Sequence, residues 1–139
     1  MDVDGDWPVF FTGGEEDVMA WLRDSGVERI RVEYTDYAGI ARGKAVALMQ
    51  FEHVLNHGVA FCATVFAFSV TADVVMGTDY AESIGYGDLI VKPDLSTLRL
   101  LRHEGGAAQV MGKVVWPNGT SLEGCPRNVL ERVTQRAAD

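Results

Sequence analysis

The sequence predicts an α+β fold, with five or six short strands in a mixed sheet and two or three helices on one side. Three observations indicate this fold. Residues 28–48 alternate apolar and polar side chains on both sides of a turn, which is typical of a β-hairpin. Residues 14–24 and the segment from Pro126 place apolar side chains at helical spacing. The 139 residues, 47% of them hydrophobic, suffice for one domain with a real core.

The first helix is expected over residues 14–24, after a flexible arm formed by residues 1–11. Thr12 and Glu15 have the spacing of a capping box, in which a hydroxyl and a carboxylate satisfy free backbone N–H groups. Gly26 provides the stop signal, because glycine readily adopts the left-handed conformation that ends many helices.

Two strands are expected at residues 28–35 and 40–48, joined by a turn at 36–39. We expect Thr35 to pair with Ile40 across the hairpin. Because side chains directly opposite each other share a face of the sheet, this register predicts one polar face. Its residues are Arg31, Glu33, Arg42 and Lys44.

The remaining elements are predicted from apolar runs bounded by turn residues. They are a short helix at 51–57 ended by Gly58, a long buried central strand at 59–69, an irregular loop at 71–86, strands at 88–91, 96–101 and 107–116, and a last helix beginning at Pro126. A long loop inside a compact domain is commonly functional or mobile.

Charge and composition exclude several classes of function. The 12 Lys and Arg against 20 Asp and Glu give a net charge of −8, which repels phosphate backbones and anionic lipid. We therefore expect neither nucleic acid nor a membrane as a partner. No window approaches the ~18 apolar residues of a membrane span, and the acidic start is unlike a signal peptide. Two cysteines are too few for a disulfide scaffold, and we expect a cytoplasmic protein.

Three groups of residues are candidates for chemistry, and each has an ordinary explanation. His53 and His57 lie four apart on the expected helix and could form a zinc site with Cys62, although surface or half-buried histidines are more common. Cys62 near His57 is also a candidate nucleophile, but the apolar run around it favours a core cysteine. A cluster of carboxylates is either a cation or amine site or a solvated acidic loop. Its members are Asp79, Glu82 and Asp88.

Three segments resemble glutamine synthetases, in the order and spacing of that family. Residues 32–44, Val-Glu-Tyr-Thr-Asp-Tyr-Ala-Gly-Ile-Ala-Arg-Gly-Lys, are similar to the family's opening hairpin. Residues 87–99, Gly-Asp-Leu-Ile-Val-Lys-Pro-Asp-Leu-Ser-Thr-Leu-Arg, are similar to its Asp-apolar-Pro-Asp-x-Ser-Thr segment. Residues 125–130, Cys-Pro-Arg-Asn-Val-Leu, resemble the start of its catalytic half. Residues 101–104 depart from the Pro-Trp of many relatives.

The resemblance implies a β-grasp amino-terminal domain at residues 12–124, with residues 125–139 beginning a catalytic domain that is absent here. Such ligases join glutamate to ammonia or an amine through a γ-glutamyl phosphate, using ATP and Mg or Mn, in glutamine biosynthesis and nitrogen metabolism. Their subunits form ring homo-oligomers, in which this domain closes the active site of an adjacent subunit. The implied partners are the protein's own carboxy-terminal domain, neighbouring subunits, glutamate and an amine. We expect the 139 residues alone to be inactive, with no cofactor or metal bound.

The resemblance also implies an amine site, whose candidates are Cys62, Ala63, Thr64 and Asp88, and no catalytic residue within the chain. Cys62 stands where the family's Gly-x-x-Phe-Asp-Gly-Ser-Ser stretch has its Asp. A neutral thiol cannot hold ammonium as a carboxylate does, because it carries no full charge. This departure indicates a branch that uses bulkier amines, such as the γ-glutamylpolyamine synthetases.

Two other functions remain open from the sequence. One is a stand-alone β-grasp binding or interaction module, since the chain holds no catalytic set. The other is a small metal-binding protein that uses His53, His57 and Cys62.

Overall fold

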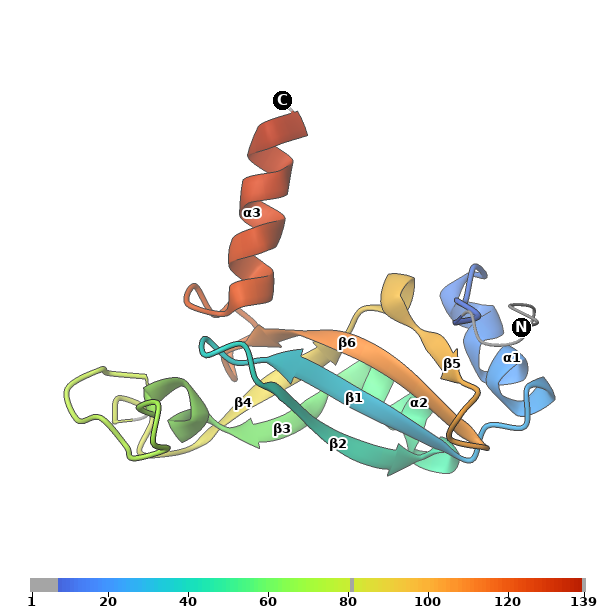
Figure 1. Ribbon diagram of the computed structural model, residues 1–139, viewed down its shortest axis with the longest axis horizontal. Helices are drawn as coiled ribbons and strands as arrows, with labels where there is room; N and C mark the ends of the chain where they lie inside the picture. The colour runs from blue at the N-terminus through green and yellow to red at the C-terminus, as the bar shows by residue number, and fades with distance from the viewer. Residues whose placement is uncertain (1–7, 81, 139) are drawn as a thin grey trace, which may run out of the picture.

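A mixed sheet organises the chain, and helix α2 lies against one of its faces (Figure 1). The structure, a computed structural model, describes residues 8–80 and 82–138. The strands are β1 (Arg29–Thr35), β2 (Ala41–Ala47), β3 (Val59–Cys62), β4 (Asp88–Pro93), β5 (Arg99–Leu101) and β6 (Ala107–Val115). Their order is β2-β1-β6-β4-β3, with β5 also paired to β6. Only β1 and β6 run parallel. The predicted α+β, β-grasp-like fold is confirmed.

Three α-helices and three short 3₁₀ turns complete the described residues. The α-helices are α1 (Val18–Asp24), α2 (Leu48–His57) and α3 (Pro126–Ala138). The 3₁₀ turns are η1 (Glu15–Asp17), η2 (Ala63–Ala67) and η3 (Leu95–Thr97). Residues 71–80 and 82–86 form no helix or strand, which confirms the predicted irregular loop for its described part.

The ends of the first helix differ in how well they were predicted. The capping box predicted from Thr12 and Glu15 is wrong. The first turn begins at Glu15, so its N-cap residue is Gly14, and the N-cap residue of α1 is Asp17. No side-chain hydrogen bond caps either of these described turns. The stop at Gly26 is confirmed. Gly26 has φ +69°, and its N–H donates to the Arg23 carbonyl at 2.9 Å, while Val27 donates to Leu22 at 3.0 Å. These two bonds form a Schellman motif.

The expected flexible arm is only partly described, since residues 1–7 lie outside the described residues. The next residues run beside β5. The Phe11 N–H donates to the Leu98 carbonyl at 2.8 Å, and the Leu100 N–H donates to the Val9 carbonyl at 2.9 Å.

The hairpin forms as predicted, but its register is shifted by one residue. Thr35 pairs with Ala41 instead of Ile40, because the Asp36 carboxylate accepts hydrogen bonds from the N–H groups of Ala38 and Ile40 and holds Ile40 in the turn. A slip of one residue moves every side chain of a strand to the other face.

The predicted polar face of the hairpin is therefore wrong. Arg42 and Lys44 lie opposite Tyr34 and Val32, on the face that carries the core. Arg42 binds the Asp36 carboxylate at 2.9 Å. The face with Arg31 and Glu33 instead has small residues of β2 opposite, Ala45 and Gly43.

The predicted central strand at 59–69 is also wrong. β3 ends at Cys62, and among the described strands it pairs with β4 alone, at the edge of the sheet. The chain then turns into η2, whose Phe66 stacks on Tyr34 with ring centroids 5.8 Å apart. A continuous apolar run does not distinguish a strand from a buried helical turn. The strand expected at 96–101 is likewise shortened to Arg99–Leu101 by η3.

The core lies between α2, α1 and the inner face of the sheet. Its largest fully buried side chains are Tyr34, Phe51, Leu22, Ile30, Leu89, Leu98 and Leu122. The sheet curls around this core, since Lys44 on edge strand β2 donates to the Ala60 carbonyl on the opposite edge strand at 2.6 Å. The same ammonium lies 4.8 Å from the centre of the Phe61 ring.

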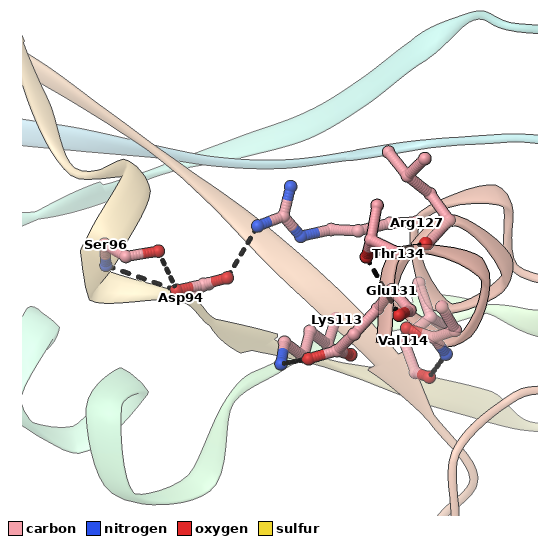
Figure 2. Close-up of polar contacts among 9 residues, drawn as sticks. Asp94, Ser96, Lys113, Val114, Arg127, Glu131 and Thr134 are labelled. Carbon is pink, nitrogen blue, oxygen red and sulfur yellow. Dashed lines mark hydrogen bonds and ion pairs between the residues drawn. The ribbon is translucent and has the colours of Figure 1, made fainter. Parts of the chain in front are cut away.

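Helix α3 stands away from the sheet and is anchored only at its base (Figure 1). Figure 2 shows the anchor: Arg127 Nη2 lies 2.6 Å from Asp94 Oδ2, and Lys113 binds Glu131. The buried Asn128 side chain donates to the carbonyls of Val114 and Leu122. The same helix exposes a row of apolar residues. They are Val129, Leu130 and Val133.

Candidate functional site

The register of the two strands β3 and β4 places Cys62 directly opposite Asp88. The next residue, Ala63, donates its N–H to the Gly87 carbonyl at 3.0 Å, so the two segments stay paired beyond the strand. Thr64 Oγ1 lies 2.9 Å from the Cys62 sulfur, within hydrogen-bond reach. The structure thus brings together all four residues that the sequence marked, although 24 or more residues separate Asp88 from the others in the chain.

Cys62 is exposed, which corrects the expectation of a core cysteine. The reason is the alternation of side chains along β3. Val59 and Phe61 point to the core, so Ala60 and Cys62 face outward. Cys125 is the buried cysteine instead.

The exposed pair presents a carboxylate and a neutral sulfur side by side. Asp88 is exposed, whereas Ala63 beneath the pair is fully buried. An exposed carboxylate can accept hydrogen bonds from an ammonium group and stabilise its charge, while the thiol contributes only a weak donor or acceptor. The arrangement can hold a cation at one point and leaves an uncharged surface beside it.

Aromatic packing supports this pair from below. The Tyr34 ring meets the Phe61 ring edge to face, with ring centroids 4.8 Å apart, and stacks on the Phe66 ring. It therefore packs against both β3 and η2. The Tyr34 hydroxyl is buried and has no hydrogen-bond partner among residues 8–80 and 82–138. Burial raises the pKa of Tyr34 to about 12, because the phenolate would lose its hydration.

The other sequence candidates do not form a metal site with Cys62. His53 and His57 stack with ring centroids 4.2 Å apart on α2, as their helical spacing predicts, and both are exposed. Within residues 8–80 and 82–138, no three His, Cys, Asp or Glu side chains are grouped so that they could hold a metal ion.

The acidic loop residues have local structural contacts. Both carboxylate oxygens of Glu82 accept the Gly77 N–H, at 3.1 and 3.0 Å, and close a turn. Ser83 donates to the backbone carbonyl of Asp79 at 2.8 Å.

A hollow of about 380 Å³ beside η2 was not predicted from the sequence. It opens between η2, the loop after it, the β1–β2 turn and the segment before α3. Its lining residues are Tyr37, Phe66, Ala67, Phe68, Ser69, Val75, Thr78, Tyr80 and Gly124. The available signal was the number of apolar residues in the loop, which a purely solvated loop does not need.

The described part of the chain contains no helix with the length and hydrophobicity needed to cross a bilayer.

A curled mixed sheet packed on one helix defines a β-grasp-like domain, and the exposed Cys62–Asp88 pair at its edge is the candidate site. No family model matches the chain. It is 30% identical over 129 residues to a γ-glutamylethanolamide synthetase, GlnA4, of Streptomyces coelicolor, covering 90% of this chain and 28% of that protein. It is 33% identical over 118 residues to the γ-glutamylpolyamine synthetase GlnA3 of the same organism, covering 85% and 25%.

The fold agrees with these sequence matches. A solved structure of GmaS in complex with ADP superposes with a TM-score of 0.70 at 22% identity, covering 88% of this chain and 25% of that one. The chain thus spans about a quarter of the length of the relatives it matches. In sequence the chain is similar to glutamine synthetase-like ligases, and in fold it is similar to a solved structure of GmaS, in each case over about a quarter of the relative's length.

Proposed function

We propose that the chain is the amino-terminal domain of an ATP-dependent ligase that joins glutamate to an amine. The domain closes the active site of an adjacent subunit in a ring homo-oligomer and shapes the amine site there. The observation that carries the proposal is the β3–β4 register, which pairs Cys62 with Asp88 and keeps Ala63 and Thr64 beside them. These are the residues for which the resemblance implied an amine site.

In this proposal Asp88 binds the ammonium form of the amine and receives the proton that the nitrogen must lose before it attacks. Cys62 contributes no charge, so the site holds the nitrogen less strongly than two carboxylates would. The uncharged Cys62 side chain beside Asp88 favours an amine with an organic substituent over ammonia. The ethanolamide and polyamine specificities that name the two Streptomyces relatives support this choice.

The described residues do not themselves fit the ATP and divalent metal ions of the proposed reaction. No group of metal-ligating side chains occurs among them, and no glycine-rich phosphate loop precedes a helix in the sequence. The proposal therefore assigns this domain only the binding, orientation and deprotonation of the amine.

The test is an amine screen with the intact polypeptide, in which γ-glutamylamide products and released ADP are measured together. We expect Asp88→Asn to raise KM for the amine roughly 10-fold or more, because a hydrogen bond to a charged group contributes about 1.5–3 kcal/mol. KM for ATP and glutamate should not change.

Asp73→Asn is the matched control, since Asp73 is an exposed carboxylate in the loop before β4 and accepts a hydrogen bond from the Thr71 hydroxyl. Equal amine KM values for the two variants would refute the role of Asp88. Absence of any amide product with every amine would refute the ligase function and favour the stand-alone binding module.

A further inference from the structure

Six of the nine residues that line the hollow beside η2 are aromatic or aliphatic, and none of the nine is charged. Its volume of about 380 Å³ lies in the range of small-molecule sites. Four aromatic rings face it, from Tyr37 in the β1–β2 turn, Phe66 and Phe68 after β3, and Tyr80 in the loop. A ligand in this hollow must therefore present an apolar body.

Contacts within the protein hold the walls of the hollow in place. The Val75 N–H donates to the Ala67 carbonyl at 2.8 Å, which ties the loop to η2. Tyr80 packs on the opposite wall, because a Cβ atom added at Gly124 would lie 2.2 Å from the Tyr80 hydroxyl. The Tyr80 ring also lies 6.4 Å from Phe66, centre to centre. The hollow is therefore formed before any ligand arrives.

The stretch of chain that supplies most walls of the hollow carries only negative charge, and Arg42, which follows the turn that holds Tyr37, is paired with Asp36. No Lys, Arg or His occurs between His57 and Lys92, whereas this stretch carries four carboxylates. They are Asp73, Asp79, Glu82 and Asp88. Such a field attracts cations and repels carboxylates and phosphates. Aromatic ring faces add a further attraction for an organic cation. A ligand that fits both the apolar lining and the surrounding carboxylates carries an ammonium group on an apolar body.

We propose that the hollow binds the organic portion of the acceptor amine, an alkyl or aryl ammonium, while the nitrogen lies at Asp88. The link to catalysis rests on the function proposed above. The five residues of η2 lead from Cys62 to the wall of the hollow at Phe66 and Ala67. At about 2 Å per residue this is roughly 10 Å, the length of a six- to eight-carbon chain. The proposed acceptor is thus a long or aromatic amine.

Val75→Trp tests the proposal, because Val75 lines the hollow, is 46% exposed and can carry a larger ring that fills the space. Val70→Trp is the matched control: it makes the same change in the same loop at a site that is 95% exposed and outside the hollow. Thr78→Trp is a second filling variant at another exposed lining position. Circular dichroism and thermal melts establish that each variant folds.

The first measurement is binding of hexylamine, benzylamine and methylamine to the 139-residue chain by amide chemical shifts. We expect hexylamine and benzylamine to move the signals of Ser69, Val75, Thr78 and Gly124, and hexanoate not to. Each buried methylene should tighten binding about fourfold. The filling variants should lose the shifts, and Val70→Trp should keep them.

The second measurement is the ratio of kcat/KM for hexylamine to that for methylamine in the intact polypeptide. In the native protein and in Val70→Trp we expect this ratio to be at least about 10, because two or more methylenes of hexylamine are buried. The filling variants should lower it by most of that factor. An active ligase whose ratio is unaffected by filling the hollow overturns the inference alone. An inactive polypeptide whose chain still binds hexylamine in the hollow overturns the proposed function and leaves the binding site standing.

Discussion

The contact between Asp94 and Arg127 should be the main electrostatic anchor of α3. Their charged atoms lie 2.6 Å apart, and the side chains are only 20% and 27% exposed. The second ion pair at the base, Lys113–Glu131, has side chains that are 40% and 41% exposed. Hydrogen bonds between charged, partly buried groups contribute about 1.5–3 kcal/mol, against about 0–1 kcal/mol for exposed pairs. A double-mutant cycle separates the two values.

We expect a coupling energy of about 2 kcal/mol between Asp94→Asn and Arg127→Met, measured by urea unfolding at pH 7. The matched cycle of Glu131→Gln and Lys113→Met should give less than about 1 kcal/mol. Asparagine keeps an oxygen that can accept the Ser96 hydrogen bonds, so the first cycle isolates the charge. Equal couplings in the two cycles would refute the assignment of the anchor.

The same contact predicts a dependence on acid. Burial alone would raise the pKa of Asp94, but the hydrogen bonds from Ser96 and the charge of Arg127 outweigh it and lower the pKa below 3.8. A lowered pKa in the folded state adds stability that is present above the unfolded pKa and is lost as pH falls through the folded one. The difference in unfolding free energy between the native protein and Asp94→Asn should therefore shrink below about pH 4.

Two further changes test the packing behind the site. Tyr34→Phe removes a buried hydroxyl that has no partner in the described part of the chain, so it should raise the unfolding free energy at pH 7 by about 1 kcal/mol. The native protein should lose stability between pH 10 and about 12, as pH rises toward the raised pKa of Tyr34, and the variant should not show this loss. A variant less stable than the native protein at pH 7 would contradict the prediction. Gly58→Ala should cost about 3 kcal/mol, because Gly58 has φ +79° and an added Cβ would lie 2.5 Å from Ile90 Cγ2. Gly26→Ala, at φ +69° with open space around it, should cost only about 1 kcal/mol in the same denaturation assay, and equal losses would show that the contact with Ile90 is irrelevant.

The sequence was sufficient for elements whose signal is local. The strand at 28–35, the helix end at Gly26 and the last helix at Pro126 follow from periodicity and from the backbone preferences of single residues. These signals act within a few residues, so tertiary packing does not override them.

The errors arose where a side chain or a distant partner decides the outcome. The hairpin register depends on the Asp36 carboxylate, which adds Ile40 to the turn, and side-chain capping of this kind is not visible in a pattern of alternation. The end of β3 depends on Tyr34, whose ring offers Phe66 a stacking partner and draws the chain into η2. Asp36 is close in sequence but acts through its side chain, whereas Tyr34 is distant in sequence from η2 and reaches it only in the folded chain.

The candidate site was predicted by resemblance and not by chemistry. Periodicity placed Cys62 in a long buried strand, where its sulfur would be inaccessible, and only the family pattern marked it together with Asp88. Their pairing across β3 and β4 follows from a register that no local feature of either strand specifies. The apolar residues of the loop were the one signal for the hollow, and they did not locate it because its walls come from four separate stretches of chain.

The place of β6 in the sheet governs how the chain is made. β6 pairs with β1, β4 and β5, and its Gln109 bonds to Glu33, 76 residues earlier. Until β6 leaves the ribosome, β1 and β2 are a two-stranded ribbon, which is marginal in water. At roughly 5–20 residues per second, that interval lasts several seconds. During it the unpaired edge of β1 is open to other nascent chains, so the risk of aggregation is concentrated in the period before Val115 is synthesised.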